Sequence, residues 1–140
     1  MIRIVFYYLL VLAVIVAAYR RGDRETRVAA SICLVASLLS AALMTFHQGV
    51  AVGVAIIDLG VLALFVALAL QTQRFWPLWV AGLQLTTVMG HGLRLLQPDL
   101  VNIAYAAAMR FWAYPILVIL MIAALRSHRY ALPPAGGAAA

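Results

Sequence analysis

The chain has little charge and few of the residues from which catalytic and metal sites are built. Only 10% of its 140 residues are charged, it has one cysteine, and all ten basic residues are arginine. A single cysteine excludes an internal disulfide and a multi-cysteine metal site. The absence of lysine excludes a lysine Schiff base and a lysine general base. Soluble domains carry about a quarter charged residues, so the low charge already separates this chain from them.

Most of the sequence consists of apolar residues. They make up 67% of the sequence, and the mean hydropathy is +1.07. A water-soluble fold of this length buries only about two-thirds of the surface that its chain exposes, so it could not hide this much apolar surface. The composition therefore excludes a soluble enzyme, a disordered tail and a nucleic-acid-binding module. It favours a protein that lies in a lipid bilayer.

Five apolar stretches approach the roughly 20 residues that a membrane-spanning helix needs. They cover residues 2–19, 28–46, 50–70, 75–96 and 103–125. Polar or helix-breaking links separate them, and Asp99 or Asn102 can cap the last helix. The sequence therefore predicts an all-α polytopic bundle of about five transmembrane helices, a single domain over residues 1–126. Residues 127–140 are predicted to form a basic and then disordered tail.

The arginines indicate an orientation. If there are five spans, only Arg3, Arg94 and Arg110 lie toward one side of the membrane. Positively charged loops stay cytoplasmic, so we expect the N-terminus outside, the C-terminus inside, and the cytoplasmic arginines near anionic lipid headgroups. Those cytoplasmic residues are Arg20, Arg21, Arg24, Arg27, Arg74, Arg126 and Arg129.

Two alternatives to this topology stay open. The first stretch could be a cleaved signal peptide, because Val16-Ala17-Ala18 is a passable cleavage site. The stretch 75–96 has a polar second half and could re-enter the membrane, which would move the C-terminus outside. The arginine cluster directly after the first stretch argues against the signal peptide, since such clusters resist translocation.

Two stripes of small residues are typical of helices that pack closely in lipid. The first is Ala29, Cys33, Ser37 and Ala41, and the second is Gly82, Thr86 and Gly90. Both are interpreted as helix-packing surfaces, which would serve folding and oligomer contacts equally well. Cys33 is interpreted as a small packing residue, because nothing near it in the sequence would stabilise a thiolate.

A candidate polar cluster lies inside the predicted spans. Asp58 falls in the third span and Arg110 in the fifth, while the fourth carries Gln84, Thr87, His91 and Arg94 on one helix face. A charge inside the bilayer is costly unless it is paired or protonated. We therefore expect Asp58 to pair with Arg94 or Arg110, with His91 close by, in the outer half of the membrane. Asp58 is then either a proton- or cation-binding carboxylate or a structural partner for a neighbouring helix.

The sequence offers no pattern typical of a cofactor or an enzyme. His47 and His91 lie at similar predicted depth, so haem ligation is conceivable, and Asp58 could join them at a metal. Their spacing matches no metal motif, and we expect His47 in a loop, so we predict neither haem nor metal. The chain has no paired carboxylates and no nucleophile with a base in reach by pattern. We expect no catalytic residue and no enzymatic activity.

One segment carries a resemblance. Residues 74–79 read Arg-Phe-Trp-Pro-Leu-Trp and continue through Gln84-Leu85 to His91, with Asp58-Leu59 ahead of them. This segment resembles one found in small multi-pass inner-membrane proteins of alphaproteobacteria, over about residues 58–96. The resemblance implies a bacterial inner membrane and carries no activity with it.

Three functional hypotheses follow from these features. The first is a non-enzymatic accessory or interaction subunit, or a homo-oligomer, and it rests on the small size and the small-residue stripes. The second is a small transporter or proton or ion pathway that uses Asp58 and His91, with Arg94 and Arg110 tuning their charge. The third is a binder of a lipophilic ligand or cofactor, with the polar cluster at the mouth of an interhelical cavity.

Overall fold

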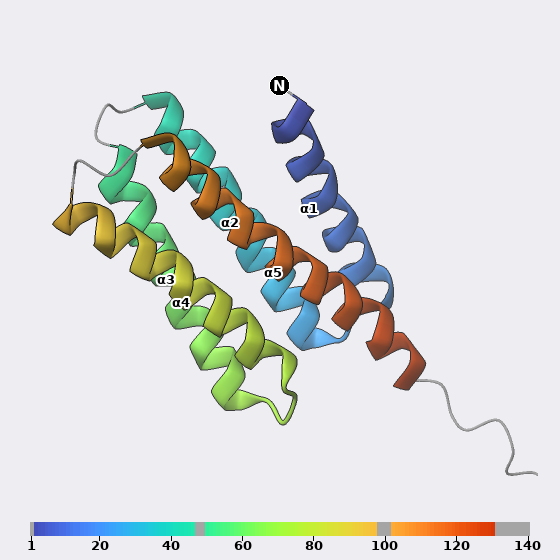
Figure 1. The fold of residues 1–140 in the computed structure, drawn as a ribbon. Helices are drawn as coiled ribbons and strands as arrows, with labels where there is room; N and C mark the ends of the chain where they lie inside the picture. The colour runs from blue at the N-terminus through green and yellow to red at the C-terminus, as the bar shows by residue number, and fades with distance from the viewer. Residues whose placement is uncertain (1, 47–49, 98–101, 131–140) are drawn as a thin grey trace, which may run out of the picture.

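The computed structural model describes residues 2–46, 50–97 and 102–130, and almost all of them are helical (Figure 1). Each predicted stretch coincides with one helix, although four helices are longer than predicted, two of them by four residues or more. Helix α2 begins four residues before the predicted start, and α5 continues past residue 125, so residues 127–130 are helical rather than part of a tail. The helices are α1 (Ile2–Arg21), α2 (Arg24–Phe46), α3 (Val50–Gln71), α4 (Trp76–Leu96) and α5 (Asn102–Tyr130).

The early start of α2 has a clear cause in Asp23. Its side-chain Oδ1 accepts a hydrogen bond from the backbone N–H of Thr26 at 3.0 Å and another from the Thr26 hydroxyl. Its carbonyl accepts the N–H of Arg27 at 3.0 Å. Asp23 is therefore the N-cap of α2, and the link from α1 to α2 is only Gly22 and Asp23.

The five helices form a closed ring. Each helix packs against the next in the chain, α5 packs back against α1, and α2 also contacts α5. The helices run alternately up and down (Figure 1). The α1–α2 link, the α3–α4 link and the end of α5 therefore share one end of the bundle, here called the arginine-rich end.

The apolar core lies toward the arginine-rich end. Its largest member, Phe65, is 1% exposed and belongs to a cluster of buried side chains drawn from all five helices. The other buried members are Val11, Val14, Ala18, Ala29, Ala30, Val61, Val80, Ala81, Ile116, Leu117 and Leu120.

The outside of the bundle is strongly apolar. Leu12 on α1 is 58% exposed, Ile56 on α3 is 66% exposed and Trp79 on α4 is 69% exposed. Among the described residues, three helices are long and apolar enough to cross a membrane: α1, the part Arg24–Leu43 of α2, and the part Val52–Gln71 of α3. Helix α5 contributes a shorter apolar stretch, Phe111–Ser127. These helices and the many exposed apolar side chains are compatible with a membrane protein.

Candidate functional site

The structure brings three of the predicted polar residues together between α3 and α4. The Asp58 Oδ2 atom lies 2.8 Å from Nε2 of His91. The Gln84 side chain donates from Nε2 to Asp58 Oδ1 at 3.0 Å and to the Asp58 carbonyl at 3.2 Å. Asp58, Gln84 and His91 are called the Asp58 cluster below. The cluster ties α3 to α4 at two points of α4 that are about 10 Å apart along its axis.

The side chains of the Asp58 cluster are largely, but not completely, buried. The Asp58 side chain is 21% exposed and that of His91 is 13% exposed, while Gln84 is buried. Both carboxylate oxygens have a partner, which meets the main requirement for keeping a carboxylate in an apolar surrounding. With a proton on Nε2, His91 donates a hydrogen bond to Asp58 Oδ2, and this contact is also an ion pair when the imidazole is charged.

The remaining predicted members of the polar cluster lie differently. Thr87 is buried, and its hydroxyl donates to the Leu83 carbonyl of its own helix at 3.4 Å. Arg94 is half-buried and makes contacts of its own. Among the described side chains, however, the ion-pair partner of Asp58 is His91 and not Arg94. The side chain of Arg110 lies outside the described residues.

The positions of His91 and Arg94 along the axis of α4 explain why the histidine is the partner of Asp58. Asp58 bonds to Gln84 and His91, so it lies level with the turns of α4 between them. Arg94 is three residues further toward the end of α4, about 4.5 Å along the axis. His91 therefore stands nearer to the level of the carboxylate than Arg94 does.

One of the two small-residue stripes faces the bundle, and the other faces outward. On α2, Ala29 is buried, and the rest of that stripe, Cys33, Ser37 and Ala41, is half-buried against the bundle. On α4, Gly82 and Thr86 are exposed and Gly90 is half-buried. A Cβ added to Gly82 would have no atom within 4 Å. The α2 stripe thus serves packing within the chain, whereas the α4 stripe faces outward.

A second interhelical polar contact was not expected from the sequence. The Tyr7 hydroxyl of α1 lies 2.8 Å from the Ser37 hydroxyl of α2, and the Ser37 hydroxyl is also 2.7 Å from the Cys33 carbonyl. The Tyr7 ring meets the Tyr114 ring of α5 edge-on, with centroids 6.1 Å apart. This contact joins three helices. Its only sequence-level indication is the hydroxyl of Ser37 within a stripe of small residues.

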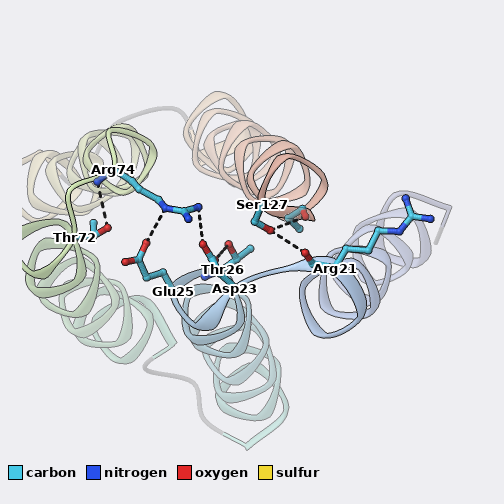
Figure 2. A network of polar contacts seen from close by, with 8 residues as sticks. Arg21, Asp23, Glu25, Thr26, Thr72, Arg74 and Ser127 are labelled. Carbon is cyan, nitrogen blue, oxygen red and sulfur yellow. Dashed lines mark hydrogen bonds and ion pairs between the residues drawn. The ribbon is translucent and has the colours of Figure 1, made fainter. Parts of the chain in front are cut away.

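The arginine-rich end holds a network that the sequence interpretation also missed. Arg74, from the α3–α4 link, places Nη1 2.6 Å from Asp23 Oδ2 and Nε 3.6 Å from Glu25 Oε2 (Figure 2). The Ser127 hydroxyl of α5 donates to the Arg21 carbonyl at 2.9 Å. Figure 2 shows that these contacts join both links and the end of α5. Asp23 and Glu25 lie among the arginines at residues 20–27, and this alternation of charge is the pattern that could have predicted the network.

The other arginines of this end lie on the surface. Arg20, Arg21, Arg24, Arg27 and Arg126 are exposed, which suits contact with solvent or headgroups. The side chain of Arg129 lies outside the described residues.

In the part of the chain that is described, no group of three or more His, Cys, Asp or Glu side chains could hold a metal ion. His47, which was predicted to lie at a depth similar to that of His91, lies outside that part. Cys33 is a free, half-buried thiol packed against the core.

Proton exchange and hydrogen bonding are thus the chemistry that the Asp58 cluster supports, through its carboxylate, imidazole and amide. Comparisons with known protein families, with curated proteins and with solved structures find no match for this chain.

Proposed function

We propose that this chain is a five-span protein of a bacterial inner membrane, with the N-terminus outside and the C-terminus inside. The alternating helices and the apolar outer surface support five crossings. The described arginines at the links and at the end of α5 lie at one end of the bundle, which is the distribution expected of a cytoplasmic face. Helix α4 can also lie in the bilayer as a span, because its polar side chains Gln84 and Thr87 are buried in the bundle.

Within that membrane, the protein acts as a non-enzymatic interaction subunit that associates through the outer face of α4. The observation that carries this proposal is the outward stripe. Gly82 and Thr86 are exposed between large apolar side chains, Leu78 at 63% exposure and Met89 at 67%. Small residues let a second helix approach closely in lipid, where close packing drives association. The Thr86 hydroxyl bonds the Gly82 carbonyl of its own helix at 3.2 Å, so it presents no unmet polar group to such a partner.

Purification in a mild detergent tests this proposal. The complex that forms is compared between the natural chain and Gly82→Leu, which fills the stripe, with Leu12→Ala on the exposed face of α1 as the matched control. We expect the natural chain and the control to carry a second copy or another membrane protein in fixed proportion, and Gly82→Leu to lose it. A chain that runs as a monomer alone, or a complex that survives Gly82→Leu, would contradict the proposal.

A second candidate function is proton or cation transfer at the Asp58 cluster, and the 2.8 Å contact between His91 and Asp58 favours it. Asp58→Asn keeps the shape of the side chain and an acceptor for Gln84 but removes the titrating carboxylate. In proteoliposomes loaded with a pH-sensitive dye, this variant should lose flux while it still folds. Equal flux in the natural chain and in Asp58→Asn would exclude this candidate.

A further inference from the structure

A groove of about 790 Å³ lies along α2, between the end of α1 and helix α3. Its polar mouth is at the arginine-rich end and includes Tyr19, Arg24 and Arg27. Its other end is apolar and includes Leu39, Ile57, Gly60 and Leu64. The groove lies on helices other than α4, so it goes beyond the association surface proposed above.

The mouth of the groove carries net positive charge. Arg24 and Arg27 line it and are exposed. Asp23 also lines it, but its carboxylate forms an ion pair with Arg74, whose Nη1 lies 2.6 Å from Asp23 Oδ2. Two guanidinium groups are therefore left to face an incoming anion, and guanidinium is well suited to bind phosphate oxygens with two hydrogen bonds.

The mouth is also held in shape. The Arg27 guanidinium lies over the Tyr19 ring at 6.0 Å, and its Nε donates to the Ala18 carbonyl at 3.4 Å. The Tyr19 hydroxyl lies 3.0 Å from the Ser31 hydroxyl. These contacts fix one of the two arginines at the junction of α1 and α2 and leave its terminal nitrogens able to donate.

The apolar part has the dimensions of a lipid chain. From Arg24 to Leu39 the groove follows α2 for about 22 Å. One leaflet contributes half of a hydrocarbon core about 30 Å thick, so the groove accommodates an acyl chain of one leaflet. A Cβ at Gly60 would have no atom within 4 Å, so this wall is open.

We propose that this groove binds an anionic phospholipid. Its phosphate lies between Arg24 and Arg27, and one acyl chain follows α2 past Gly60. A cationic mouth with an apolar channel directly beneath it matches the charged headgroup and the acyl chain of such a lipid. A zwitterionic lipid has its phosphate charge balanced and should bind more weakly. Inorganic phosphate lacks the chain and should not compete.

Native mass spectrometry of the full chain in detergent tests the proposal. The protein is titrated with phosphatidylglycerol or with phosphatidylcholine, and the lipid-bound fraction is counted. Three variants are compared: Arg24→Gln with Arg27→Gln at the mouth, Gly60→Leu in the channel, and Arg20→Gln with Arg126→Gln as a control. The control removes the same charge from exposed positions that do not line the groove. Circular dichroism shows whether each variant folds, and Gly60→Ala replaces Gly60→Leu as the channel variant if the leucine variant does not fold.

We expect phosphatidylglycerol to occupy at least five times more of the protein than phosphatidylcholine. Both groove variants should lose this preference, the control should keep it, and millimolar inorganic phosphate should leave it unchanged. Equal binding of the two lipids would overturn the proposal. So would full retention in Gly60→Leu, or an equal loss in the control, because either result would mean attraction to surface charge without a groove. Loss of the α4 association would leave this experiment unaffected, so the two proposals fail separately.

Discussion

Replacing Asp58 with alanine should destabilise the contact between α3 and α4. The substitution removes the side-chain acceptor for Gln84 at 3.0 Å and the partner of His91 at 2.8 Å. It leaves the hydrogen bond from Gln84 to the residue-58 carbonyl in place. Interhelical hydrogen bonds in membrane proteins contribute about 0.6 kcal/mol on average and about 1.7 kcal/mol at most. Losing two of them should lower the free energy of unfolding by about 1 to 3 kcal/mol.

Asparagine at the same position should cost less than alanine. It keeps an oxygen in reach of the Gln84 amide and a polar group beside His91, and it loses only the charge. We therefore expect the free energy of unfolding of Asp58→Asn to lie between that of the natural chain and that of Asp58→Ala. The matched control is Thr86→Ala on the exposed face of α4, because the described Thr86 hydroxyl bond stays within its own helix. That change should stay within about 0.5 kcal/mol of the natural chain.

The assay is SDS-induced unfolding in mixed micelles. Cys33 is the only cysteine of the chain and packs against the core, so its reaction with a fluorogenic maleimide reports opening of the bundle. A double-mutant cycle with His91→Ala isolates the contact between the two side chains. The cycle should give a coupling energy of about 0.6 to 1.7 kcal/mol. If Asp58→Ala costs no more than Thr86→Ala and the cycle is additive, the Asp58 cluster does not hold α3 and α4 together.

Three further substitutions test the packing, each by the same unfolding assay. Gly22→Ala should destabilise by about 1 to 3 kcal/mol, because its Cβ would lie 2.5 Å from the Ala18 carbonyl oxygen; an unchanged midpoint would mean that this link is not tight. Tyr7→Phe removes the 2.8 Å contact with Ser37 and should cost about 0.6 to 1.7 kcal/mol, and a neutral effect would show that the contact is not formed in detergent. Phe65→Ala empties the centre of the core and should cost about 3 to 5 kcal/mol; a loss below that of Tyr7→Phe would contradict the placement of the core.

Helix positions were predictable because the breaks between them are chemically distinct. Pro77 is favoured in a first helical turn, and α4 indeed begins at Trp76 with no side-chain cap. The start of α2 was missed because the arginine cluster suggested a long polar loop. The cap by Asp23 lets the helix begin inside that cluster, and a two-residue link leaves the charged side chains on helical turns.

The candidate site was predictable as a set of polar residues but not as a set of pairs. The helical period places Gln84 and His91 on one face of α4, and the structure turns that face to α3. Which residue of that face meets Asp58 depends on how far α4 is shifted along α3. That shift depends on how α3, α4 and the link between them pack. The spacing of the polar residues along α4 does not reveal it.

The outward position of the second stripe did have an indication in the spacing. Gln84 lies two residues after Gly82, about 200° around the helix. Once the polar face of α4 is turned inward, Gly82 must therefore face out, as the structure shows. The sequence interpretation left this stripe open between folding and oligomer contacts, and its position opposite the polar face of α4 favours contacts outside the chain.

A pair of reporter fusions after the last described residue measures whether the chain crosses the membrane five times. Green fluorescent protein folds to its bright form in the cytoplasm, whereas alkaline phosphatase is active only outside it. Fused separately after Tyr130 and expressed in a bacterium, the fluorescent protein should be bright and the phosphatase inactive, while a phosphatase inserted at residue 48 should be active. An active phosphatase after Tyr130 would contradict five crossings with the C-terminus inside, and would mean that α4 re-enters the membrane or that the number of crossings is even.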